Sequence, residues 1–178
     1  MTMDITIKKQ AFEYLLTQML LWGEEMNPIV HNSAFTRLKV LKLLFFTAAI
    51  KNEQGQDLLD VFDNFYALPN GPVESDIYNC ITSDNLTFYS FKDFSLSVKK
   101  QYNENELAEA IRTRIDIAVS TLKQKNRRLV QYSAVQLVEL SHSWFSWQSS
   151  IQIARVLGKG SYRMDVNRIR LNQQLFTI

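Results

Sequence analysis

Hydrophobic positions in the first fifty residues recur at steps of three and four, which is typical of amphipathic helices. One helix is expected over residues 6–22, where Gly23 can end it. A second helix is expected from about Ala34 to Lys51, with Asn32 or Ser33 as its N-cap. Its second half is apolar on nearly every side, so we expect it to be the central and most buried helix.

The pattern then changes in a stretch rich in aromatic, proline, glycine and acidic residues. Residues 65–68 are expected to be extended, because the residue before a proline is biased away from the α conformation. Asn70 and Gly71 both tolerate the backbone angles of a tight turn. Pro72 suits the first position of a helix, so we expect a short helix to begin there.

Apolar and polar residues alternate with a period of two between residues 86 and 98, as in a half-buried strand. Phe94, Leu96 and Val98 would form the apolar face of one strand. We expect a small hairpin that turns near residues 92–93, and little other sheet.

Two capping-box spacings predict further helices, the first set by Asn103 and Glu106 and the second by Ser133 and Gln136. The remaining patterns predict helices at residues 103–125, 133–142, about 151–158 and 165–175. The expected fold is therefore mainly α: a single compact helical domain over residues 1–178 with a small β-hairpin inserted around residues 86–98.

Composition agrees with one ordinary globular domain. The chain has 178 residues and a formal net charge of +2, which is too small to indicate bulk binding to nucleic acid. Cys80 is the single cysteine, so no internal disulfide can form. The N-terminal pattern is not that of a signal peptide, and no apolar run is long enough to span a membrane, so we expect a cytoplasmic protein.

Three short motifs occur in the order and spacing of a known family. They comprise Lys42, Leu44 and Phe46 in a Lys-Leu-Leu-Phe-Phe segment; Phe65, Ala67, Pro69, Gly71, Pro72 and Val73 in Phe-x-Ala-x-Pro-x-Gly-Pro-Val; and Leu137, Ser141, His142 and Trp147 near the C-terminal end. Together they resemble the Panacea domain, the SocA-like antitoxin family of bacteria and phages. The resemblance covers most of the chain. It implies a protein that neutralises a cognate toxin by direct binding, without catalysis.

Residue chemistry gives no independent sign of an enzyme or a metal centre. The histidines His31 and His142 lie far apart, and neither has a Cys, Asp or Glu at metal-ligand spacing. We expect His142 to be packed beside Trp147 and hydrogen-bonded to a main-chain carbonyl or a hydroxyl. Cys80 has no basic neighbour and is expected to be a buried, inert thiol. We therefore predict no enzyme activity, cofactor or metal.

The resemblance implies a toxin protein as the partner, and we expect the adjacent gene to encode it. Acidic residues between positions 53 and 84 have almost no basic neighbours in sequence, which predicts a face of negative potential. The candidate contacts on this face are Tyr66, Asn70, Glu74, Asp76 and Tyr78. The alternative interpretation is that Tyr66 and Tyr78 are simply half-buried core aromatics.

Two other functions remain open from the sequence. Some members of the family resemble adaptors that deliver a bound toxin to a cytoplasmic protease. A nucleic-acid-binding regulator of a phage or mobile-element locus is the other alternative, with residues 123–128 as its basic contact. Basic residues in such a run more often cap a helix end in solvent, so nucleic acid is the weaker alternative.

Overall fold

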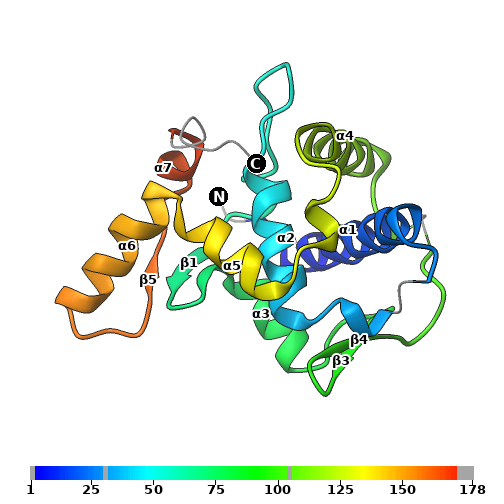
Figure 1. The fold of residues 1–178 in the computed structure, drawn as a ribbon, viewed down its shortest axis with the longest axis horizontal. Helices are drawn as coiled ribbons and strands as arrows, with labels where there is room; N and C mark the ends of the chain where they lie inside the picture. The colour runs from blue at the N-terminus through cyan, green and yellow to red at the C-terminus, as the bar shows by residue number, and fades with distance from the viewer. Residues whose placement is uncertain (1–2, 30–31, 104–105, 172–178) are drawn as a thin grey trace.

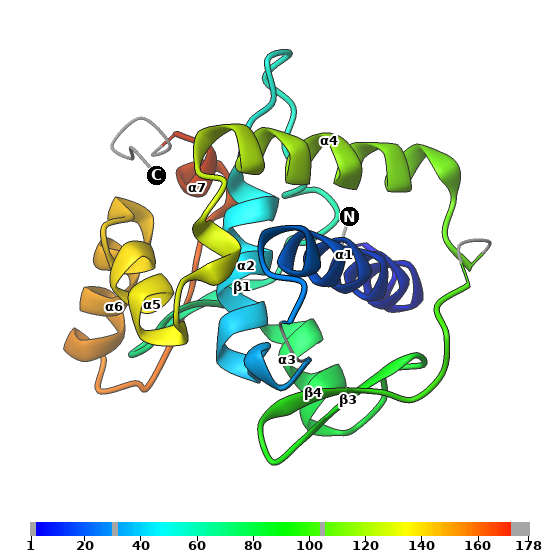
Figure 2. The same ribbon diagram turned by 45° about the vertical axis from the view of Figure 1, so that its right-hand side comes forward.

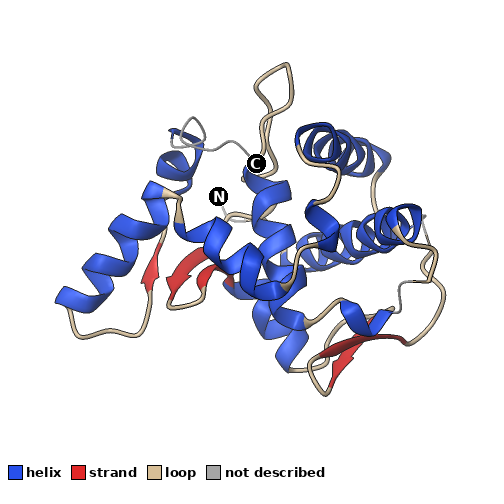
Figure 3. Cartoon of the chain, viewed as in Figure 1, coloured by secondary structure: helices blue, strands red, loops and turns tan. Residues whose placement is uncertain are grey.

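The computed structural model describes residues 3–29, 32–103 and 106–171. These residues are mainly α-helical, as the sequence predicts, and their short strands form two antiparallel sheets (Figures 1 and 3). Among them, no helix combines the length and the apolar character that crossing a membrane would need.

The described helices are, in chain order, α1 (Ile5–Met26), the 3-10 turn η1 (Asn32–Ala34), α2 (Arg37–Ala49), α3 (Ser75–Thr82), α4 (Glu109–Lys125), the 3-10 turn η3 (Leu129–Gln131), α5 (Ala134–His142), α6 (Phe145–Val156) and α7 (Val166–Leu171). The strands are β1 (Phe65–Leu68), β2 (Gly71–Glu74), β3 (Tyr89–Lys92), β4 (Ser95–Val98) and β5 (Tyr162–Arg163). The fold is arranged around α2.

Helix α2 lies at the centre of the molecule. Every residue from Lys39 to Ala49 is buried, which confirms the expectation for a helix that is apolar on nearly all sides. Helices α1, α4 and α5 all contact α2. Figures 1 and 2 show α1 and α4 on one side of it and α5 and α6 on the other.

The ends of the first two helices differ from the sequence predictions. Gly23 does not end α1 but lies buried inside it, next to the buried Trp22. A glycine inside a helix costs about 1 kcal/mol relative to alanine, and tertiary packing on this face outweighs that cost. Thr36 caps α2 by accepting a hydrogen bond from a helix N–H, whereas Asn32 and Ser33 belong to η1.

The two predicted capping boxes have opposite outcomes. Ser133 and Gln136 form a complete capping box at the start of α5, which confirms that prediction. Helix α4 instead begins at Glu109, later than predicted. The N–H of Glu106 donates to the carbonyl of Asn103, and both residues lie ahead of Ala108, the N-cap of α4.

Helix α6 ends and helix α7 begins close to the predicted signals, but α6 begins at Phe145, earlier than predicted. Helix α6 ends at Val156, and Gly158 follows it with a φ of +64°. Asp165 precedes α7, and its carboxylate accepts a hydrogen bond from the N–H of Asn167 at 2.8 Å. The predicted extension of this helix to Leu175 lies outside the described residues.

Strands β1 and β2 form a hairpin around Gly71, whose φ is +92°. The expected extended segment and the turn at Asn70 and Gly71 are therefore confirmed. The expected helix start at Pro72 is wrong, because Pro72 lies in β2 and α3 begins at Ser75 with Glu74 as its N-cap. Strand β2 is at the edge of its sheet, where proline is tolerated because one side of the strand needs no ladder hydrogen bond.

A third strand extends this sheet and was not predicted. Strand β5 pairs antiparallel with β1, with Tyr66 opposite Arg163, so the strand order is β2-β1-β5. The N–H of Met164 also donates to the carbonyl of Phe65. The pairing joins the segment after α6 to the β1–β2 hairpin.

The predicted hairpin at residues 86–98 is confirmed as β3 and β4. Its turn residues Asp93 and Phe94 have φ values of +48° and +65°. The predicted apolar face is only partly correct, since Leu96 is buried but Phe94 and Val98 are 66% and 50% exposed. The turn packs on the start of α2, where the N–H of Arg37 donates to the carbonyl of Phe94 at 2.8 Å.

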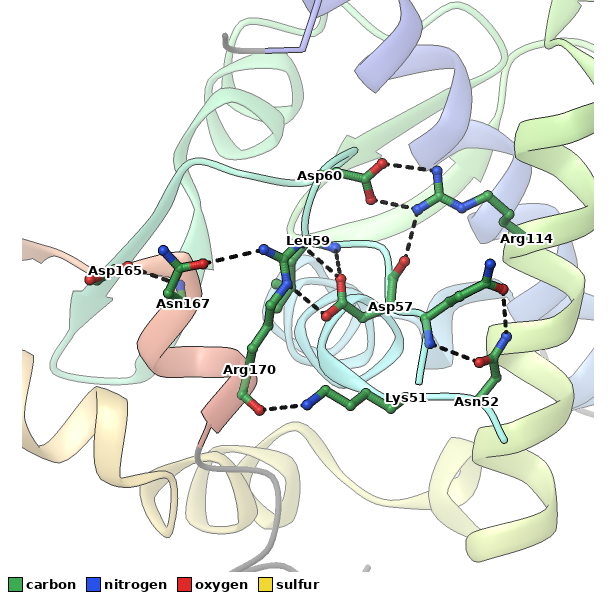
Figure 4. Close-up of polar contacts among 10 residues, drawn as sticks. Lys51, Asn52, Asp57, Leu59, Asp60, Arg114, Asp165, Asn167 and Arg170 are labelled. Atoms are coloured by element: carbon green, nitrogen blue, oxygen red, sulfur yellow. Dashed lines mark hydrogen bonds and ion pairs between the residues drawn. The ribbon is translucent and has the colours of Figure 1, made fainter. Parts of the chain in front are cut away.

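Ion pairs fasten α4 and α7 to the loop that follows α2 (Figure 4). Arg170 Nε lies 2.9 Å from Asp57 Oδ2, and Lys51 Nζ donates to the carbonyl of Arg170 at 3.0 Å. On the other side of the loop, Arg114 Nη1 donates to Asp60 Oδ2 at 2.9 Å. Distant parts of the sequence therefore supply the cations that pair with Asp57 and Asp60.

Candidate functional site

Side chains of the three motifs meet at the β1–β2 turn. A Cβ atom placed on Gly71 would lie 2.3 Å from Ser141 Oγ and 3.0 Å from Lys42 Nζ. The contact with Ser141 Oγ is shorter than real Cβ contacts and that with Lys42 Nζ is unusually tight, and the positive φ of Gly71 independently favours glycine. Lys42, Gly71 and Ser141, one residue from each motif, therefore pack together where α2, β2 and α5 meet.

The two groups with reactive chemistry in this region are inaccessible. Lys42 is 0% exposed, and its Nζ donates to the carbonyl of Pro72 at 2.6 Å. Burial lowers the pKa of Lys42 from 10.5 to about 7, and no described carboxylate lies within ion-pair distance of it. Cys80 is also buried, and burial raises the pKa of its thiol. A substrate cannot reach the Lys42 amine in this conformation, so we interpret it as structural.

His142 and Trp147 contact the β1 side of the same turn. Trp147 Nε1 donates to the carbonyl of Leu68 at 2.9 Å, and the His142 ring stacks on Trp147 with centroids 3.9 Å apart. Burial lowers the pKa of His142, and a hydrogen bond with the main chain of Pro69 partly opposes this. The packing of His142 against Trp147 matches the prediction, but its Nε2 atom is buried with no hydrogen-bond partner among the described residues. His31 lies outside the described residues.

Three carboxylates from separate segments surround the ammonium group of Lys8. Lys8 Nζ lies 2.7, 2.8 and 2.6 Å from oxygens of Asp63, Glu74 and Asp76. The three carboxylates offer oxygens within 4.8 Å of one another, a spacing that could hold a metal ion. Because the ammonium already contacts all three groups, we interpret this cluster as an internal ion-pair network that fastens α1 to the hairpin.

The cluster changes the role expected for Glu74. Its side chain is 0% exposed, and Oε2 accepts the N–H of Ile77 at 2.8 Å as the cap of α3. Burial raises the pKa of Glu74, and the hydrogen bonds with Lys8 and Ile77 only partly offset this. Burial also opposes ionisation of Asp76, but hydrogen bonds from Lys8 and Asn64 outweigh it and lower its pKa. The expectation that Glu74 lies on an exposed face is therefore wrong, while Asp76 is one-third exposed.

Most acids of the face expected to be negative are paired with bases in the structure. The acids pair with bases from distant segments, namely Asp57 with Arg170, Asp60 with Arg114 and Asp84 with Lys99. In the basic run, Lys123 and Arg127 both pair with Glu25. The acids Asp57, Asp60 and Asp84 are therefore compensated by distant bases, whereas the basic run shares the single carboxylate of Glu25.

Two of the candidate partner residues line one depression beside the hairpin. Tyr66 and Tyr78 are both half-buried, and the depression has a volume of about 240 Å³. Its lining residues are Tyr66, Leu68, Val73, Ser75, Tyr78, Asn79 and Ser161. Asn70 is exposed at the turn. Of the predicted contacts, Tyr66, Asn70, Asp76 and Tyr78 therefore reach the surface and Glu74 does not.

A larger cavity of about 560 Å³ lies along β5 and the segment that leads into α7. It is lined by Asp63, Ser150, Ile153, Tyr162, Arg163, Met164, Asp165, Val166 and Arg168. None of these residues belongs to the three motifs. No sequence pattern indicates this cavity, because β5 contains only two residues and has no readable periodicity.

Comparison with known proteins identifies the family. The model of the family described as "Antitoxin SocA-like, Panacea domain" matches residues 40–148, which is more than half of the chain. No curated protein and no solved structure matches the chain. The matched range includes all three motifs and the junction that they form at the β1–β2 turn. The chain therefore belongs to the antitoxin SocA-like, Panacea domain family.

Proposed function

We propose that this protein neutralises a cognate toxin by direct, stoichiometric binding and that residues 1–178 act as a single domain. Membership of the antitoxin-like family carries the proposal, because it associates the chain with toxin–antitoxin systems in general. The geometry favours binding over catalysis. Lys42, Gly71 and Ser141 pack against one another, and the reactive amine of Lys42 is fully buried.

The toxin-binding surface that we propose is centred on Tyr66 and Tyr78. Tyrosine is enriched at the centres of protein interfaces, because it offers a large apolar ring with a polar end. The depression that these rings share, about 240 Å³, has room for an apolar side chain of a partner. Asn70 and Asp76 would contribute polar contacts at its border. Glu74 would support this surface from inside, through its hydrogen bonds to α3 and Lys8.

The test is co-expression in bacteria with the protein encoded by the adjacent gene. We expect the product of the adjacent gene to arrest growth when it is expressed alone. Growth should return when the two proteins are expressed together, and the two should co-purify as a complex. The Tyr66→Ala/Tyr78→Ala double variant should lose the complex, whereas Val156→Ser, at an 85% exposed position on α6, should keep it. Restored growth without a complex would contradict direct binding, and dependence on a host protease would then identify an adaptor. A harmless neighbour would contradict the proposed toxin partner.

A further inference from the structure

We propose that Arg37 and Phe94 extend the toxin-binding surface and receive a carboxylate group of the toxin. This inference rests on the proposed antitoxin function and assigns the chemistry of the contact. It comes from an arrangement at the start of α2 and the β3–β4 turn, where a cation and two aromatic rings lie together. The sequence patterns did not indicate either residue as a contact.

The guanidinium group of Arg37 is held by rings and has no acidic partner. Its central carbon lies 4.9 Å from the ring centroid of Phe94 and 5.7 Å from that of Tyr78. No carboxylate of the described residues forms a salt bridge with it, whereas Arg114, Arg127 and Arg170 each have one. Arg37 is therefore a positioned and only half-buried cation whose charge is uncompensated within the described chain.

Phe94 is placed unfavourably for the stability of the chain alone. Its ring is 66% exposed, and its backbone has a φ of +65°, which a bulky residue rarely adopts. Asp93 and Phe94 form a two-residue turn with positive φ at both positions, and asparagine, aspartate and glycine are the residues preferred in such turns. A glycine at position 94 would suit the turn better. The aromatic ring thus points to a role in contact with another molecule.

Tyr78 connects this site with the proposed surface. Its ring lies near Arg37 and also lines the 240 Å³ depression that contains Tyr66. Tyrosine and arginine are both enriched at interface hot spots, and a planar guanidinium can bind a carboxylate through two parallel hydrogen bonds. The partner that fits is a toxin segment with an aspartate or glutamate next to an apolar side chain. The acid would reach Arg37 and the apolar group would enter the depression.

The decisive variant is Phe94→Gly, because its effects on folding and on binding have opposite directions. The turn becomes Asp-Gly, so we expect a melting temperature equal to or above that of the wild type. Affinity for the toxin should fall by about tenfold or more, as for the loss of a hot-spot ring. Arg37→Ala should weaken binding similarly. Arg37→Lys, which keeps the charge but not the planar group, should lie between.

The controls separate this inference from the proposed function. Arg155→Ala removes an exposed arginine from α6 and should leave affinity unchanged. If the wild type binds the toxin and both Arg37→Ala and Phe94→Gly bind equally well, the inference is overturned and the proposed function stands. If the wild type binds no toxin, the proposed function fails and this inference with it. Light scattering provides a further test. If the wild type is a dimer and Phe94→Gly is a monomer, a second copy of the chain covers this site. That result also overturns the inference.

Discussion

The variant Gly71→Ala examines the junction of the three motifs most directly. Placing a side chain at a φ of +92° costs about 1–2 kcal/mol. The new Cβ would also lie 2.3 Å from Ser141 Oγ, and overpacking of this kind typically costs about 1–3 kcal/mol. The two contributions together lower the free energy of unfolding by about 2–5 kcal/mol. For a chain of this size, the melting temperature should fall by roughly 5–15 °C.

Thermal unfolding followed by circular dichroism measures the effect, and Ser141→Ala separates its causes. This second change removes the Oγ atom but leaves the backbone strain at Gly71. Among the described residues, Ser141 Oγ donates only to the carbonyl of Val138 within α5, at 2.8 Å, so Ser141→Ala alone should cost about 1 kcal/mol or less. The double variant should then be more stable than the sum of the single effects predicts. Strict additivity would refute the proposed clash, and an unchanged melting temperature in Gly71→Ala would refute the whole account of this junction.

Three further predictions concern buried charges. Lys8→Met leaves three carboxylates facing one another and should lower the free energy of unfolding by about 3 kcal/mol. The control Lys9→Met, at the half-buried neighbouring position, should lower it much less. Equal melting temperatures of the two variants would contradict the ion-pair network. Burial lowers the pKa of Lys42 to about 7 in the folded protein, against 10.5 in the unfolded chain, so the unfolded chain binds more protons between these pH values. The free energy of unfolding of the wild type, measured by urea titration, should therefore rise with pH in this window relative to that of Lys42→Met. Parallel pH profiles of the two proteins would contradict this prediction. Arg170→Ala removes the contact with Asp57, so amide exchange in α7 should become faster while α2 stays protected; unchanged exchange in α7 would show that the contact contributes nothing.

The elements that could be predicted from the sequence are those stabilised by local signals. The capping box of Ser133 and Gln136 acts within one helical turn, and it begins α5 as predicted. The burial of α2 follows from an apolar pattern that leaves no face for solvent. Gly71 was identified as a turn residue from its conformational freedom alone. Its close contacts with Lys42 and Ser141 could not be predicted, because they join positions that are far apart in the sequence.

The expectations that proved wrong depended on charge and pairing over long sequence distances. The acids near Glu74 look unpaired in the local sequence, but their cations come from α1, α4 and α7. Pro72 looks like a helix start because Asn70 and Gly71 precede it, yet pairing with β1 extends the strand to Glu74. The unpredicted β5 supplies a second partner for β1. Tertiary pairing therefore overrode a reasonable local signal.

The alternation of β1 explains how one fold can keep its motif and still present a distinct surface. Successive side chains of a strand point to opposite sides. Phe65 and Ala67, which define the motif, are both 0% exposed, whereas Tyr66 and Leu68 occupy its unspecified positions and line the depression. The motif thus specifies the inner packing and leaves the outer residues free to suit a partner. Charge reversal at the buried Glu74 would accordingly test the fold, and it is substitution at Tyr66 that tests recognition.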